Sequence, residues 1–241
     1  MNTVKLWTRD FRLVILASAM GTLGSIVGGF ALAFLVFDET GSTLASALIV
    51  AIQLVPYLLL PILIAPLMDR LPRKAFLVAG DVANAILLAG MGIWLLFFEF
   101  SYVGYLAVSL LLSCLGATDE LAFTSIYPEL IPKGAEQKGY AVSSMLYPVL
   151  KVIMTPLAAV LLDAIGVAWI LIAQSILSLA AAITESFIHA EKTKQERNMP
   201  YSLRAWGEDI LEAVRYLKKE RGLRSIFGYM AVTNGVSDGF S

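Results

Sequence analysis

"APLMDRLPRK", residues 65–74, packs one acid and three bases between two long apolar segments. Residues 44–68 carry no charge, and residues 75–98 carry only Asp81. An apolar helix of about 20 residues crosses the roughly 30 Å core of a bilayer. The stretch therefore marks a short polar loop between two predicted membrane spans, and its bases help to set the orientation of the chain.

The whole chain repeats this alternation of apolar spans and short polar loops. Of its 241 residues, 58% are hydrophobic and 15% are charged, whereas soluble domains have about a quarter of their residues charged. The predicted spans cover residues 13–37, 44–68, 75–98, 102–123, 139–162 and 165–188. Backbone groups in lipid must be paired within their own segment, so these spans should be helices. We therefore predict an all-α polytopic membrane protein, with a six-helix transmembrane bundle and the start of a seventh helix.

The remaining composition argues against other classes of protein. A net charge of −1 gives no general attraction to nucleic acid, and the single cysteine, Cys114, excludes an internal disulfide. No metal-ligand cluster, phosphate-binding loop or nucleophile with its base is recognisable. The sequence therefore predicts no enzyme, no catalytic residue, no metal site and no cofactor; a membrane-embedded enzyme is the alternative.

Basic residues fall almost entirely on one side of the predicted bundle. Three precede the first span, three follow the second, two follow the fourth and nine follow the sixth. The charged residues in the other connections are all acidic, namely Asp38, Glu39, Glu99 and Asp163. Lys151, inside the fifth span, is the one exception among the 18 bases. Because cytoplasmic loops carry the excess of bases, we predict a multi-pass protein of the cell membrane with a cytoplasmic N-terminus.

The opening stretch resembles a loop signature of the major facilitator superfamily, Gly-x-x-x-Asp-Arg-x-Gly-Arg-Arg/Lys, between helices two and three. Its charged positions are filled by Asp69, Arg70, Arg73 and Lys74. Ala65 and Pro72 replace its two glycines. The resemblance implies that this loop is a conformational latch, in which Asp69 accepts hydrogen bonds from neighbouring helix ends. A solvated charged turn is the alternative.

Two further stretches are similar to the same family. "YPELIPKGAEQKGYAVSS", residues 127–144, resembles the loop before helix five in the drug- and siderophore-exporter branch. "TPLAAVLLDAIG", residues 155–166, resembles a degenerate antiporter signature that keeps Pro156. The resemblance implies a secondary transporter whose two six-helix halves rock about a central site. It further implies a proton-coupled exporter of drug-like or siderophore-like molecules; a non-transporting half-transporter scaffold or sensor is the alternative.

The family pattern leads to an expected organisation of four parts. These are a cytoplasmic N-terminus (1–12), an N-terminal six-helix domain (13–189), a cytoplasmic linker with an amphipathic helix (190–222), and the start of a seventh span in a chain that continues further (223–241). The expected partners are membrane lipids, a small-molecule substrate and a C-terminal half of the transporter.

Ionisable residues inside spans are candidates for function, because burying a charge in hydrocarbon is costly. The candidate cavity or coupling residues are Lys151, Asp119, Asp81, Gln53 and Asn84. The helical rise of 1.5 Å per residue brings Lys151 within reach of Asp119, with Asp81 as a rival partner. Lys151 then either faces the central cavity or forms a static packing pair. Glu185, one turn from the end of the sixth span, is interpreted as interfacial.

Small residues follow one face of the first span, at Ala17, Gly21, Gly24 and Gly28. Such residues allow membrane helices to approach closely. We expect this face to be mainly a helix-packing surface.

Overall fold

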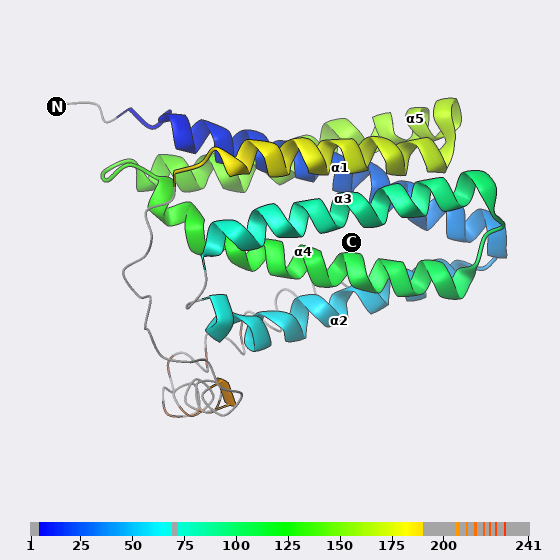
Figure 1. The fold of residues 1–241 in the computed structure, drawn as a ribbon, viewed down its shortest axis with the longest axis horizontal. Helices are drawn as coiled ribbons and strands as arrows, with labels where there is room; N and C mark the ends of the chain where they lie inside the picture. The colour runs from blue at the N-terminus through cyan, green and yellow to red at the C-terminus, as the bar shows by residue number, and fades with distance from the viewer. Residues whose placement is uncertain are drawn as a thin grey trace. The chain divides into compact units, whose positions relative to one another are not determined.

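The computed structural model describes residues 5–68 and 72–189, together with eight single positions between 206 and 229. The chain divides into two compact units, Met1–Gln195 and Glu196–Ser241. The first unit contains the helices α1 (Arg9–Thr40), α2 (Thr43–Met68), α3 (Arg73–Phe97), α4 (Tyr102–Leu130) and α5 (Glu136–Ser186) (Figure 1). All five are long and apolar enough to cross a membrane. The described part of the chain contains no strand, which agrees with the predicted fold class.

The second unit is described only at its eight single positions, each of which is helical. Trp206 is half-buried, and the other seven positions are exposed. Most of the predicted amphipathic helix (190–222) and of the seventh span (223–241) lies outside the described residues.

α1 is longer than its predicted span because both of its ends are capped. The Thr8 hydroxyl accepts a hydrogen bond from the Phe11 N–H at 3.2 Å and fixes the first turn. At the other end Gly41 has a φ of 62° and donates its N–H to the Phe37 carbonyl. Glycine adopts this left-handed conformation without the steric cost that other residues meet. α1 therefore ends at Thr40, three residues beyond the predicted Phe37.

α4 extends beyond its predicted end at Phe123 to Leu130 and includes Pro128. Proline has no N–H to donate to the preceding turn. Beside the carbonyl of Thr124, which thereby loses its helical partner, Arg73 of α3 donates to the carbonyl of Ser125 at 2.9 Å. The first residues of the stretch interpreted as a loop before helix five are therefore helical.

α5 is assigned as one helix, but it consists of two helical segments, here called its first and second limbs, that are joined at a sharp turn. A straight helix of its 51 residues would be about 77 Å long at 1.5 Å per residue. Gly166 interrupts it with a φ of 76° and a ψ of 167°, and the chain folds back there (Figure 1). Ala158 and Ile170, on either side of Gly166, accordingly share one apolar cluster with α1. The five elements thus form six segments that run along the bundle, with the last turn at Gly166 and not at Asp163.

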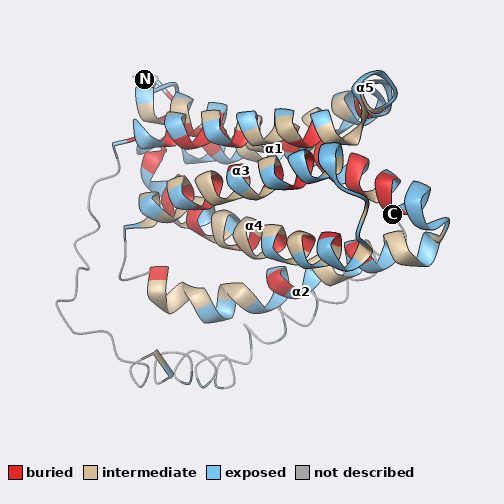
Figure 2. Ribbon diagram, turned by 45° about the vertical axis from the view of Figure 1, so that its right-hand side comes forward, coloured by how far each residue is buried: buried red, intermediate tan, exposed pale blue. Residues whose placement is uncertain are grey.

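Two apolar clusters join the helices at opposite ends of the bundle. One end, here called the Phe11 end, joins the starts of α1 and α3, the ends of α2 and α4, and both ends of α5. Its buried residues include Leu6, Phe11, Met68, Leu77, Tyr127, Ala135 and Ile188. The Tyr105 end is held by Leu32, Leu35, Leu88, Met91, Tyr105 and Leu171. Figure 2 shows buried residues on the inner faces of the helices, whereas α2 is mostly exposed or half-buried.

The small-residue face of α1 receives a polar side chain from α5. A Cβ atom at Gly24 would lie 2.9 Å from Cγ of Gln174, and one at Gly28 would overlap the end of the same side chain. Gly21 has open space beside it. The predicted packing face therefore operates at Gly24 and Gly28, where α1 and the second limb of α5 meet closely.

Candidate functional site

Three acidic side chains from three helices come together inside the bundle. Asp81 of α3, Asp119 of α4 and Glu185 of α5 lie close enough for their charges to influence one another, and Glu120 of α4 lies close to Asp119 in the same sense. Asp81 and Glu185 have exposed fractions of only 9% and 4%. They are buried because they continue the apolar faces of their helices: Leu77 and Ala85 flank Asp81 at helical spacing, and Ala181 precedes Glu185 by one turn.

These three carboxyl groups, here called the acid cluster, have no basic partner among residues 5–68 and 72–189. Oδ1 of Asp119 and Oε2 of Glu185 are also buried without a hydrogen-bond partner. Within the same residues, no group of three potential ligands is arranged to hold a metal ion. Protonation is the simplest way to keep unpaired carboxyl groups in a dry interior. The acid cluster is therefore suited to binding and releasing protons.

Two bases of the loop signature anchor α3 to its neighbours. Nη1 of Arg73 donates to the Ser125 carbonyl and lies 2.8 Å from Oε1 of Glu129, both on α4. Nζ of Lys74 donates to the carbonyls of Ser186 and Ile188 at 2.6 and 2.9 Å, at the end of α5. Cations at helix C-termini satisfy free carbonyls and interact favourably with the helix dipole. These contacts join the same three helices that carry the acid cluster.

The other two residues of the predicted latch, Asp69 and Arg70, lie outside the described residues. Their role in a latch stays a prediction. The sequence interpretation did not identify Glu129 as the partner of Arg73, because it treated residues 127–130 as a loop. Glu185 was interpreted as interfacial, and the structure instead buries it against α3 and α4.

Lys151 does not form the predicted pair with Asp119 or Asp81 in the described part of the chain. Its side chain is exposed, and Nζ lies 5.6 Å from the centre of the Tyr147 ring. Lys151 precedes Ala158 by two helical turns, so the two share one face of α5. Ala158 is fully buried against α1, whereas Lys151 is uncovered. The first limb of α5 thus presents a charged side chain on an open part of its packing face.

The remaining predicted residues have less defined positions in the site. Asn84 is half-buried on α3, one turn from Asp81, and Gln53 is half-buried on α2. Pro156 is exposed inside the first limb of α5, which remains helical around it. None of these three contributes a hydrogen bond to the acid cluster within the residues that the structure describes.

Comparison with known proteins gives one match. Residues 13–240 match the family model described as "Major Facilitator Superfamily". The searches of curated proteins and of solved structures give no match.

Proposed function

Because the chain belongs to the Major Facilitator Superfamily, a family of transporters and not of enzymes, we propose that it forms one half of a proton-coupled exporter. The long apolar helices make it a multi-pass membrane protein. The proposed substrates are drug-like or siderophore-like small molecules, after the resemblance of residues 127–144 to that exporter branch. A C-terminal half would complete the central site between two rocking halves.

The acid cluster is the observation that supports proton coupling. Its three carboxyl groups interact with one another and have no basic partner in the described part of the bundle. Three anions in such a space would repel one another and lack solvation. We infer that the cluster holds protons while the helices are closed around it. Entry of water then favours the ionised form and releases protons.

The anchors link this protonation to a change of conformation. Lys74 binds the carbonyl of Ser186, the residue that follows Glu185. Arg73 binds the end of α4, the helix that carries Asp119. Because the anchors and the acid cluster depend on the same three helices, a movement of α3 would break the anchors and open the cluster together. Proton release would thus accompany the switch between the two access states.

Orientation follows from the distribution of bases. The Phe11 end contains the anchors Arg73 and Lys74 and the basic connection between α4 and α5. We propose that this end faces the cytoplasm, in accordance with the positive-inside rule. The Tyr105 end, with its acidic connections, would then face outward.

Cysteine reporters should reveal this orientation in intact cells. In a Cys114→Ser background, we expect Glu99→Cys and Asp163→Cys to react with a membrane-impermeant maleimide, whereas Lys133→Cys reacts only after the cells are opened. Glu99 lies between α3 and α4, Asp163 lies in α5 three residues before the turn at Gly166, and Lys133 lies between α4 and α5. External labelling of Lys133→Cys with protection of Glu99→Cys would refute the proposed orientation.

Transport should respond to a pH gradient. We would reconstitute the complete transporter in vesicles and test a panel of lipophilic fluorescent dyes and iron-free siderophores. For inside-out transporters, an acidic lumen should drive uptake of at least one probe, and a protonophore should stop it. Uptake that proceeds equally without a pH gradient would contradict proton antiport.

A further inference from the structure

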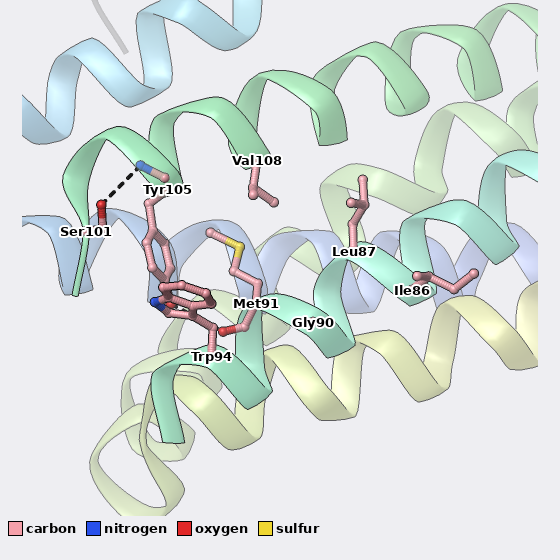
Figure 3. A pocket seen from close by; sticks show the side chains of 9 residues that line it. Ile86, Leu87, Gly90, Met91, Trp94, Ser101, Tyr105 and Val108 are labelled. Atoms are coloured by element: carbon pink, nitrogen blue, oxygen red, sulfur yellow. Dashed lines mark hydrogen bonds between the residues drawn. The ribbon is translucent and has the colours of Figure 1, made fainter. Parts of the chain in front are cut away.

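An apolar groove lies between α3 and α4 at the Tyr105 end, away from the acid cluster. It has a volume of about 580 Å³. Figure 3 shows Trp94 and Tyr105 at one end of the groove and Ile86 and Leu87 toward the other. Ile86 and Trp94 lie eight residues apart on α3, so the groove extends about 12 Å along that helix. It is therefore elongated along α3.

Glycine keeps this groove open. Gly90 and Gly104 lie on its walls, and a Cβ atom at Gly90 would have no neighbour within 4 Å. A Cβ atom at Gly104 would only come to 3.5 Å from the Ser101 hydroxyl. Larger side chains at Gly90 would thus fill space that the surrounding helices leave empty.

The walls offer mainly carbon atoms, because the polar groups of Trp94 and Tyr105 already have partners. Nε1 of Trp94 donates to the Glu99 carbonyl at 3.2 Å, and the Tyr105 hydroxyl donates to the Met91 carbonyl at 3.2 Å. The Ser101 hydroxyl accepts from the Gly104 N–H at 3.4 Å (Figure 3). A polar ligand in this groove would leave its own donors and acceptors unpaired. A hydrocarbon chain would not.

The mouth of the groove has the character of a membrane interface. Trp94 stacks on Phe98 with ring centres 4.6 Å apart, next to the connection between α3 and α4. Tryptophan is enriched where the hydrocarbon core meets the lipid headgroups. The exposed Glu99 follows in that connection. The sequence from Ala75 to Pro132 contains no lysine or arginine, so the connection beside the mouth carries an acid and no base.

We propose that this groove binds one acyl chain of a phospholipid whose headgroup ends in an ammonium group. The chain would lie along Ile86, Leu87 and Gly90, and the ammonium group would meet the Glu99 carboxylate. An anionic headgroup would be repelled by Glu99 and by the other acidic residues of the Tyr105 end. This inference requires only that the bundle lies in a membrane and is independent of the transport mechanism.

Quenching of Trp94 fluorescence by brominated lipids tests this proposal. The complete transporter would carry Trp94 as its sole tryptophan, with the others replaced by phenylalanine, in vesicles of phosphatidylethanolamine or phosphatidylglycerol brominated on the acyl chains. We expect half-maximal quenching at a mole fraction of lipid about two- to fivefold lower for phosphatidylethanolamine than for phosphatidylglycerol. This ratio corresponds to the free energy of one exposed ion pair. Glu99→Gln should remove this preference.

A second variant separates the groove from the general lipid contact. Gly90→Leu should fill the groove and reduce quenching by both lipids, whereas Gly29→Leu, at another glycine with open space beside it, should not. Equal quenching by both lipids in the parent and in both variants would show ordinary boundary lipid and overturn the proposal. Absence of quenching in the parent would also overturn it, because another part of the protein would then cover the groove.

Discussion

Replacing Asp119 by asparagine should abolish pH-driven transport and leave the fold intact. Asparagine keeps the size of the side chain but can no longer exchange a proton. The parent carboxyl group has a buried, unpaired Oδ1 and two acidic neighbours, so its removal sacrifices no ion pair within the described bundle. The thermal unfolding temperature should therefore stay the same or rise, because a neutral asparagine costs less to bury than an unpaired carboxyl group that can ionise. Transport in vesicles and unfolding of the purified protein would be measured together.

Asp163→Asn provides the matched control for this result. It removes the same charge from an exposed residue of the first limb of α5, three residues before the turn at Gly166 and away from the acid cluster. We expect it to keep both transport and its dependence on pH. Normal pH-driven transport in Asp119→Asn would exclude this carboxyl group from coupling, and loss of folded protein would assign it a structural role.

Gly92→Ala should destabilise the bundle, whereas Gly90→Ala should not. A Cβ atom at Gly92 would lie 2.8 Å from the Ala168 carbonyl oxygen and 3.3 Å from the Ile172 N–H nitrogen. Backbone atoms cannot move aside without shifting the second limb of α5, so the cost should be about 1–3 kcal/mol. Gly90 faces open space, and alanine there should gain up to about 1 kcal/mol of helix propensity.

Thermal unfolding of the purified variants checks this pair. The two glycines lie two residues apart on α3, so differences in expression or membrane insertion should affect them alike. We expect the unfolding temperature to fall for Gly92→Ala and to stay the same or rise for Gly90→Ala. Equal shifts would show that α3 and α5 do not pack at Gly92 as described.

Hydropathy predicts well where the apolar spans lie in the sequence. It predicts less well the residues at which the helices end. The first three predicted spans agree with α1, α2 and α3 to within a few residues, because an uncharged run of about 20 residues has few other stable states in lipid. The end of α4 was missed because Pro128 and Glu129 have the composition of a loop. Arg73 of α3 contacts this end of α4 at Ser125 and Glu129, a tertiary contact that hydropathy does not reveal.

Pairing between helices could not be predicted, because sequence spacing gives depth along a helix but not its rotation toward a neighbour. Lys151 and Asp119 have compatible depths, yet Lys151 points to an open part of the α5 face and Asp119 points into the bundle. Glu185 shows the reverse case. Its closeness to the helix end suggested the interface, while its place behind Ala181 on a buried face brings it inside.

Infrared spectroscopy of the carboxyl groups tests the central claim most directly, since it needs no knowledge of the substrate. Purified complete transporter at neutral pH would be compared with Asp81→Asn, Asp119→Asn and Glu185→Gln. We predict C=O bands of protonated carboxylic acids in the parent, and the loss of part of this signal in the variants. If the three residues contribute only carboxylate bands at neutral pH, the acid cluster holds no protons and the proposed coupling site is wrong.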